Sequence, residues 1–120
     1  MSDIRVDTIS AANGTDPVTL TKQSAAKVWV NFNGTGTIAT RDSVNVASLT
    51  DNGTGDYNIN FSSNTANSNY CSTSASRNRA TGSSQSGNSV SSKQIQMYET
   101  LSGTLGDVDN VNLAIHGDLA

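Results

Sequence analysis

The tetrapeptide NGTG occurs twice, at residues 33–36 and 52–55, and a run of alternating apolar and polar residues adjoins each copy. Alternation with a period of two is typical of a β-strand that places its apolar side chains on one face. Asn-Gly between two such runs is a strong hairpin signal, because the tight turn needs a positive φ at both positions. The sequence therefore predicts turns at Asn33–Gly34 and at Asn52–Gly53.

Alternating runs recur along most of the chain after residue 26. The clearest is "DYNINF", in which Tyr57, Ile59 and Phe61 share one face and polar amides occupy the other. No segment shows the apolar spacing of a helix of ten residues or more. The sequence predicts an all-β fold, an antiparallel sandwich or jelly roll of six or seven short strands. We expect these strands near residues 28–32, 37–39, 44–49, 57–61, 69–76, 95–97 and 111–115.

Composition divides the chain into an arm and a domain. Residues 1–26 contain Pro17 in "TDPVTLT" and predict an extended N-terminal arm, with at most one helical turn near residues 22–27. Residues 27–120 form the predicted sandwich. Within the sandwich, residues 62–92 hold 20 Ser, Thr or Asn among 31 residues and no Asp or Glu. This stretch is expected to be a variable region of polar strand and loop.

The chain has little apolar material for its length. Leu, Ile, Val and Phe together make up 23 of 120 residues. Ordering a chain costs about 1.5 kcal/mol per residue, which burial of apolar area must offset. Because Cys71 is the only cysteine, no disulfide within the chain can help. Small domains of this kind borrow surface from a partner subunit, so we expect an oligomer.

The charge pattern and the termini limit the partners. The net charge is −3, the isoelectric point is near 4.7, and no basic block is present, which argues against nucleic acid as a partner. No apolar stretch approaches the length needed to cross a bilayer, so we expect no membrane insertion. "MSDIRVDTIS" lacks the features of a signal peptide, so we expect synthesis and folding in a cytoplasm.

Two other interpretations compete with the turns. The N-x-Thr glycosylation pattern is short, and no secretory signal accompanies it; it occurs at Asn13, Asn33 and Asn52. In "DNGTGD", Asp51 and Asp56 offer oxygen atoms to calcium. An EF-hand loop that began at Asp51 would need Gly at its sixth position and Glu at its twelfth, where this chain has Asp56 and Ser62. We prefer the turns and keep an irregular calcium site as the alternative.

The sequence contains no evident catalytic constellation. His116 is the only histidine, and no pattern brings it to Cys71. Two such ligands fall short of a zinc site within one chain, although three copies of His116 on a trimer axis could hold a metal. Asp107 and Asp109 in "GDVDN" fit a turn better than an acid–base pair, and a glycan depolymerase would need such a pair. We expect no enzyme activity and no cofactor.

Four residues stand out as surface contacts, because aromatic residues and Arg are favoured at interfaces: Tyr70, Arg77, Arg79 and Tyr98. The alternative is that the tyrosines cap the core and the arginines only solubilise a neutral loop. Because the stretch around the arginines contains no acid, it would suit an anionic glycan or lipopolysaccharide.

The stretch "AKVWVNFNGTGTIATRDSVNVASLTDNGTGDYNINF" (26–61) resembles a β-domain that recurs in tailed bacteriophages, notably those of marine bacteria and cyanobacteria. "SDIRVDTIS" is similar to the start of that family, and "VNLAIHGD" to its final strand, so the resemblance covers most of the chain. Its most specific pieces are "NFNGTGT" and "TDNGTGDYNINF". The resemblance implies an all-β, non-enzymatic virion protein that forms a homotrimer, and it brings no catalytic residues. Residues 62–92 depart from the family pattern because they are richer in Ser and Asn.

The resemblance implies one of two functions on the virion surface. The first is a tail fibre or fibre-tip subunit that attaches the phage to its host, with residues 1–26 bound to other virion proteins and a host surface glycan as a partner. The second is a capsid decoration protein that stabilises the shell. Copy number distinguishes them, since a decoration protein covers the head and a fibre is present in few copies.

Overall fold

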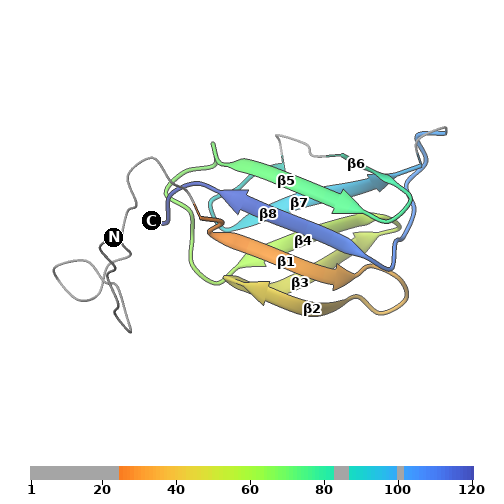
Figure 1. Cartoon of the computed structure of the whole chain (residues 1–120), viewed down its shortest axis with the longest axis horizontal. Helices are drawn as coiled ribbons and strands as arrows, with labels where there is room; N and C mark the ends of the chain where they lie inside the picture. Colours follow the sequence, from red (N-terminus) through yellow and green to blue (C-terminus); the bar gives the residue numbers. More distant parts are fainter. Residues whose placement is uncertain (1–24, 83–86, 100–101) are drawn as a thin grey trace, which may run out of the picture.

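The computed structural model describes residues 25–82, 87–99 and 102–120. In this part of the chain two four-stranded antiparallel sheets lie face to face, and there is no α-helix (Figure 1). The all-β antiparallel sandwich is confirmed, with eight strands rather than the predicted six or seven. The first sheet has the order β2 (Ala39–Val44), β1 (Val28–Asn33), β8 (Val111–His116), β5 (Cys71–Ser76). The second has the order β3 (Val46–Gly53), β4 (Asp56–Phe61), β7 (Ser92–Tyr98), β6 (Ala80–Gly82).

The hydrophobic core lies between the sheets and comes mainly from the four central strands β1, β8, β4 and β7. In β1 the buried residues are Val28, Val30 and Phe32, the same alternation that the sequence shows. Phe32 meets Tyr57 from the opposite sheet edge to face, with ring centroids 5.3 Å apart. The other buried hydrophobic side chains are Ile59, Phe61, Tyr70, Ile95, Met97, Val108, Val111, Leu113 and Ile115.

The edge strands are polar and contribute little to this core. In β5 the inward side chains are the half-buried Ser72, Ser74 and Ser76, and nearly all of β2 is exposed. A chain poor in apolar residues closes a core because it concentrates them in four strands. The composition favoured an oligomer on the ground that one subunit has too little apolar surface, and this closed core weakens that argument. The homotrimer stays a prediction.

Two of the connections between the sheets pass through an asparagine with a positive φ. Asn45 joins β2 to β3 with φ 59°, and Asn78 lies between β5 and β6 with φ 62°. Asn tolerates this left-handed conformation better than most residues with a side chain. The Asn45 side chain also accepts a hydrogen bond from the Ser63 amide at 2.7 Å and donates one to the Ser63 carbonyl at 3.0 Å. The prediction of one strand over residues 44–49 is therefore wrong, because Asn45 divides it between two sheets.

The other strand predictions differ in detail. The polar strand expected at residues 69–76 is confirmed as β5, and those at 95–97 and 111–115 as parts of β7 and β8. The stretch 37–39 is mostly loop, since β2 begins only at Ala39, and Ile38 packs against the edge of the core. The short strand β6 lies where a long loop was expected. It pairs with β7, and the ring of Tyr98 lies so close to Gly82 that a Cβ there would be 2.3 Å from a ring carbon.

Several connections meet at one end of the sandwich, which we call the loop end: residues 33–38, 53–56, 77–79, 99 and 102–110 (Figure 1). The predicted arm and Asn13 lie outside the described residues, except that Ala25 and Ala26 precede β1. Within the described ranges, no helix is long and apolar enough to cross a membrane.

Candidate functional site

Both NGTG loops pack at the loop end against the segment that precedes β8. In the first loop the amide of Gly34 donates to the carbonyl oxygen of Val108 at 2.8 Å. In the second the amide of Gly55 donates to the carboxylate of Asp107 at 2.7 Å. The hydroxyl of Tyr57 joins the two, lying 2.7 Å from the carbonyl oxygen of Gly34 and 3.0 Å from the carboxylate of Asp107. The repeat therefore has a structural role, because one acidic segment anchors both turns.

The Tyr57 hydroxyl keeps its proton in this setting. Burial raises the pKa of Tyr57 well above its ordinary value near 10, and the hydrogen bond to Asp107 and the negative charge of that carboxylate raise it further. The phenol is thus a fixed donor. Asp107 lies in the loop that precedes β8, where its carboxylate accepts hydrogen bonds from the Tyr57 hydroxyl and the Gly55 amide.

The chain reverses beside both predicted positions, but Asn33 still belongs to β1 and Asn52 and Gly53 to β3, so the connections themselves are residues 34–38 and Thr54–Gly55. The positive φ angles also fall mostly on other residues than predicted. The fourth residue of each NGTG is left-handed, with φ 61° at Gly36 and 66° at Gly55, and Gly53 has φ 128°. The expectation that Asn and Gly both take a positive φ is therefore wrong for three of the four residues: Asn33, Gly34 and Asn52.

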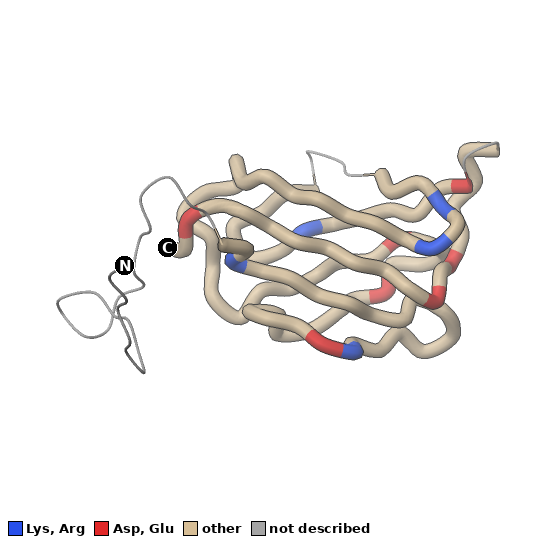
Figure 2. Tube along the Cα trace, viewed as in Figure 1, with Lys and Arg blue, Asp and Glu red and all other residues tan. Residues whose placement is uncertain are grey.

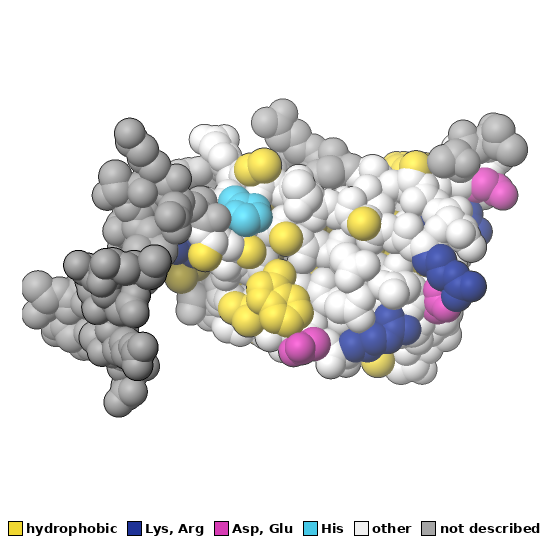
Figure 3. All heavy atoms as spheres, in the orientation of Figure 1, with side chains coloured by type: hydrophobic (Ala, Val, Ile, Leu, Met, Phe, Trp, Pro, Cys, Tyr) yellow, Lys and Arg dark blue, Asp and Glu magenta, His cyan; other side chains and the backbone are white. Residues whose placement is uncertain are grey.

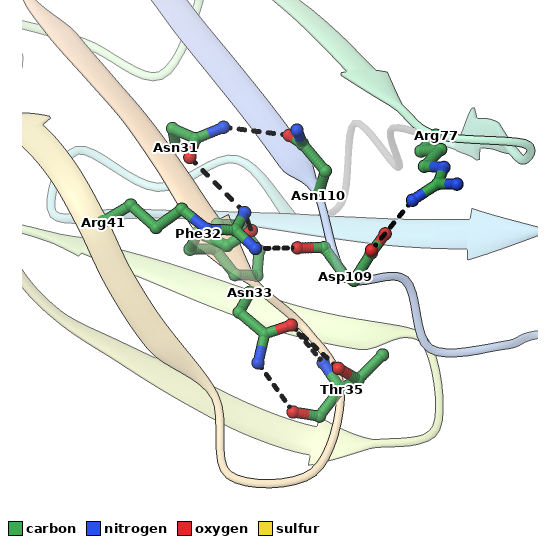
Figure 4. Close-up of polar contacts among 8 residues, drawn as sticks. All are labelled: Asn31, Phe32, Asn33, Thr35, Arg41, Arg77, Asp109 and Asn110. Carbon is green, nitrogen blue, oxygen red and sulfur yellow. Dashed lines mark hydrogen bonds and ion pairs between the residues drawn. The ribbon is translucent and has the colours of Figure 1, made fainter.

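Asn33 stabilises its loop through its side chain instead. Its oxygen accepts hydrogen bonds from the Thr35 amide at 3.3 Å and the Thr35 hydroxyl at 2.8 Å, and its nitrogen donates to the Thr35 carbonyl at 2.9 Å (Figure 4). This is the local bonding that makes Asn common in turns. Asn52 likewise donates to the Asp56 carboxylate at 3.0 Å across its turn.

A cleft of about 500 Å³ opens at the loop end and is lined by charged side chains of both signs. The guanidinium of Arg77 lies 3.2 Å from the carboxylate of Asp109, with 67% and 51% of the two side chains exposed. Basic and acidic residues lie side by side at this end of the molecule (Figure 2). Exposed pairs of this kind contribute at most about 1 kcal/mol, so the pair does little to hold the fold together.

The expectation of an acid-free arginine surface is therefore corrected. No acid occurs within residues 62–92, but the fold brings Asp109, Asp107 and Glu99 to the cleft that Arg77 and Arg79 line. The guanidinium of Arg79 lies against Gly106, where a Cβ would be 2.4 Å from its central carbon. These neighbours do not favour an anionic glycan at the arginines.

The two predicted tyrosine contacts have different surroundings. Tyr70 is only 8% exposed, meets Phe61 edge to face at 6.1 Å, and donates to the carbonyl oxygen of Ser92 at 3.0 Å. A surface contact through Tyr70 is therefore wrong, and the alternative, that it caps the core, describes it. Tyr98 is half-buried on the outside of β7, against Gly82.

The predicted metal ligands Asp51 and Asp56 both accept hydrogen bonds from within the protein. Asp51 accepts a hydrogen bond from the amide of Gly53 at 2.9 Å. Asp56 accepts from three side-chain amides, of which Gln96 is the closest at 2.6 Å. Nowhere in the described ranges do three His, Cys, Asp or Glu side chains gather to hold a metal.

Cys71 and His116 lie opposite each other, contrary to expectation. They are register partners in the antiparallel pairing of β5 with β8, and both alternate with inward-facing residues, so they share the outer face of the first sheet. Cys71 is exposed. Two such donors within one chain still fall short of a zinc site.

The most distinctive surface is the outer side of the first sheet, which we call the Trp29 face: Trp29, Asn31, Thr73, Ala75, Asn112 and Ala114. The strand register aligns Trp29, Ala114 and Thr73 in one row. A hollow of about 360 Å³ lies among these residues, and none of its lining side chains is ionisable. Hydrophobic side chains gather over β1 and β8, while the Lys and Arg side chains visible on this face lie mainly toward the loop end (Figure 3).

Hydrogen bonds hold the amides beside this hollow in place. The Asn31 nitrogen donates to the Asn112 oxygen at 2.6 Å and to the Asn110 oxygen at 2.9 Å, and the Asn112 nitrogen donates to the Asn110 oxygen at 3.0 Å. Arg41 approaches from β2, where it lies 3.5 Å from the Asn31 oxygen and also donates to the backbone carbonyl of Asp109 (Figure 4). The polar groups on this face are therefore oriented before any ligand arrives.

Our sequence reasoning missed Trp29 as a site residue, although the sequence carries a signal for it. Trp29 is the only tryptophan, and it falls in phase with the polar Asn31 and Asn33 rather than with the apolar Val28 and Val30. In a strand with one buried face, that phase places the largest apolar side chain outside the core.

Comparisons with family models, with curated proteins and with solved structures gave no match to this chain.

Proposed function

We propose that the chain is the outward β-domain of a tailed-phage appendage, a tail fibre or fibre-tip subunit that attaches the particle to its host. The proposal is supported by the resemblance carried by "NFNGTGT" and "TDNGTGDYNINF". Those two pieces build the loop end, where Tyr57 and Asp107 connect them. A domain with both turns pinned to one segment is a stable support for exposed binding residues.

The outward position of Trp29 is the observation that carries attachment. Trp29 is half-buried on the outer side of β1, and leaving part of so large an apolar surface in contact with water forgoes part of the free energy of burial. The core is filled without Trp29, which instead lines a hollow beside fixed amides. An aromatic ring next to oriented hydrogen-bonding groups in a hollow is typical of a binding site.

The alternative function is a capsid decoration protein. Its support is the sparse charge on both sheets, because a polar, weakly charged surface stays soluble without strong long-range fields and fits any exposed place on the particle (Figure 2). Quantitative mass spectrometry of purified virions separates the two functions. A fibre subunit is present in few copies and antibody labelling finds it on the tail, whereas a decoration protein is abundant over the head.

A non-enzymatic role belongs to the same proposal. Each acidic side chain that lines the charged cleft already has a partner within the protein: Asp107 accepts from Tyr57, Asp109 pairs with Arg77, and Glu99 accepts from Ser102. Prolonged incubation with host polysaccharide, followed by sizing of the polysaccharide, tests this point. Shortened chains would show that the protein is a depolymerase.

The attachment role is tested by competition. Purified protein added to host cells is expected to reduce adsorption of the phage, and Trp29→Ala is expected to lose most of that effect. Val90→Ala serves as the control, because Val90 is an exposed hydrophobic residue (39%) that lies outside the Trp29 face. Equal competition by wild type and Trp29→Ala would remove Trp29 from attachment, and no competition at all would favour the decoration role.

The homotrimer is part of this proposal and needs its own measurement. Light scattering coupled to size exclusion, on the full chain with residues 1–24 present, is expected to show three subunits. A single-subunit species that unfolds cooperatively at high dilution would exclude the trimer while leaving the fold intact.

A further inference from the structure

We propose that the hollow on the Trp29 face binds one residue of an uncharged sugar, with the ring of Trp29 packing on the apolar side of the sugar ring. The inference deepens the proposed attachment role, on which it rests for the source of the sugar. It depends on three features of this face: its shape, its hydrogen-bonding groups and its lack of charge.

The shape of the hollow comes from the order of residues across three strands. Ala114 on β8 lies between Trp29 on β1 and Thr73 on β5. In the next row Asn112 is flanked by Asn31 and Ala75. The small alanine side chains form the bottom of the hollow, and the larger Trp29 side chain forms one side of it. The volume of about 360 Å³ falls within the usual range for small-ligand sites.

The hydrogen-bonding groups are suited to hydroxyls. Within the Asn31–Asn110–Asn112 network, Asn112 uses one of its two amide hydrogens and accepts one bond at its oxygen. An amide has two donors and an acceptor with two lone pairs, so Asn112 can still donate and accept once each. Thr73 adds a hydroxyl on the other side of Ala114. Groups that both donate and accept match a sugar hydroxyl, which does the same.

The absence of charge in the hollow determines the class of sugar. None of the residues that line it is ionisable. An acidic sugar would have to bury its carboxylate there without a cation, which is costly. The nearby Arg41 is directed to backbone carbonyls of Phe32 and Asp109 and to Asn31 (Figure 4). A neutral hexose or N-acetylhexosamine therefore fits better than an acidic sugar.

A second copy of this chain is the competing occupant, because Val44, which is 46% exposed, lies beside Trp29 in the register. Sheet-to-sheet contact over this face would bury Asn31 and Asn112 against a partner, and the donors left unmatched would be costly. A sugar satisfies them with its hydroxyls. We therefore favour the sugar, and the experiment distinguishes the two occupants.

The single tryptophan makes the test direct, since the intrinsic tryptophan fluorescence of the full chain reports on this site alone. The probes are glucose, galactose, mannose, N-acetylglucosamine and their disaccharides, with galacturonate and N-acetylneuraminate as charged counterparts. We expect at least one neutral sugar at millimolar concentration to shift the Trp29 emission and shield it from acrylamide, and the charged sugars to have less effect.

Calorimetry of variants assigns the contacts. Trp29→Ala is expected to weaken binding about tenfold or more, Trp29→Phe less, and Asn112→Ala by several-fold to about tenfold. Val90→Ala should bind as wild type does, and circular dichroism verifies that each variant folds. Binding that survives both Trp29→Ala and Asn112→Ala, or that prefers the acidic sugars, would overturn the assignment.

Two further outcomes would also overturn it. If no neutral sugar perturbs the Trp29 fluorescence, the sugar site is refuted. The attachment role survives that result if wild-type protein reduces phage adsorption and Trp29→Ala does not. If Trp29 instead becomes shielded only as protein concentration rises, a second copy covers the face and the sugar does not.

Discussion

Tyr57, at the start of β4, donates its hydroxyl to the carbonyl oxygen of Gly34, a residue 23 positions earlier in the chain, at 2.7 Å. The same hydroxyl lies 3.0 Å from the carboxylate of Asp107. One side chain thereby connects both NGTG loops to the segment before β8. Because the three partners come from distant parts of the sequence, the contact can form only when both sheets are in place.

Tyr57→Phe tests the importance of this hydroxyl. It removes the donor and leaves the buried Gly34 carbonyl without it, which costs about 1–3 kcal/mol of unfolding free energy. Urea unfolding of both proteins measures the difference. Tyr98→Phe is the control, because Tyr98 donates to Gln96 on the outer side of β7, and its loss should stay within about 0.5 kcal/mol. Equal losses in the two variants would show that the Tyr57 contact has no special role.

Replacing either glycine of the first NGTG copy by alanine is expected to destabilise the protein, but for different reasons. At Gly34 an added Cβ would lie 2.6 Å from the Tyr57 hydroxyl oxygen and 2.9 Å from the Val108 carbonyl oxygen, so Gly34→Ala should cost about 2 kcal/mol or more. At Gly36 no atom lies within 4 Å, but φ is 61°, so Gly36→Ala should cost about 1 kcal/mol through backbone strain alone.

Gly36→Asn separates these two causes. Asn tolerates the left-handed conformation, so this variant should lie closer to the wild type than Gly36→Ala does. The melting temperatures of the three variants give the ranking. If Gly36→Asn were as unstable as Gly34→Ala, steric contact rather than φ would have to explain Gly36.

Local sequence patterns predicted the central strands because those strands obey a local rule. In β1 and β4 every second residue is buried, so the period-two pattern of Val28, Val30 and Phe32 shows the inner face directly. The pattern failed at Asn45, where Val44 and Val46 keep the same period although the chain changes sheet between them. A single residue with a positive φ does not change the alternation of apolar residues, so the alternation could not predict this turn.

Features that depend on pairing between distant segments could not be predicted from the sequence. The three-residue strand β6 exists through its pairing with β7, and Gly82 fits there because it leaves space for Tyr98. The register of β5 against β8 sets Cys71 opposite His116 and places Thr73 beside Ala114. For the same reason the Trp29 face could be inferred only in part, since the phase of Trp29 is local but the floor of its hollow comes from two other strands.

Asp56 predicts a pH dependence. Burial raises its pKa, but hydrogen bonds from Gln94, Asn52 and Gln96 outweigh burial and lower the pKa below the ordinary value of 3.8. A carboxylate with a depressed native pKa contributes stability that is fully present above its unfolded pKa and is lost as the pH falls through its native pKa. Asp56→Asn should therefore destabilise the protein near pH 7.

The destabilisation by Asp56→Asn should shrink as the pH falls below 3.8 toward the native pKa. Denaturant unfolding of wild type and variant across this range measures the effect. The wild type measured at each pH is the reference for the variant at that pH. A penalty that is the same near pH 7 and near pH 2 would mean that geometry rather than charge explains it.

Lys93 is the one basic side chain of the described residues that lies in the core, with no exposed surface. Its amine donates to the Asn88 side-chain oxygen, and burial lowers its pKa below the ordinary 10.5. The native state thus disfavours the charged form, and this penalty is present at neutral pH and fades as the pH rises from the native pKa toward 10.5. Lys93→Met keeps the shape of the side chain and removes the charge.

At neutral pH Lys93→Met should be at least as stable as the wild type, with a gain between zero and about 4 kcal/mol that shrinks at alkaline pH. Lys93→Ala also removes the charge but leaves a cavity where methionine would fill the space, and it should lose about 2–4 kcal/mol of unfolding free energy. Unfolding of the three proteins near pH 7 and near pH 10 gives both comparisons. A clear loss of stability in Lys93→Met near pH 7 would mean that the polar contacts of the amine outweigh its desolvation, and Lys93 would then be a stabilising part of the core.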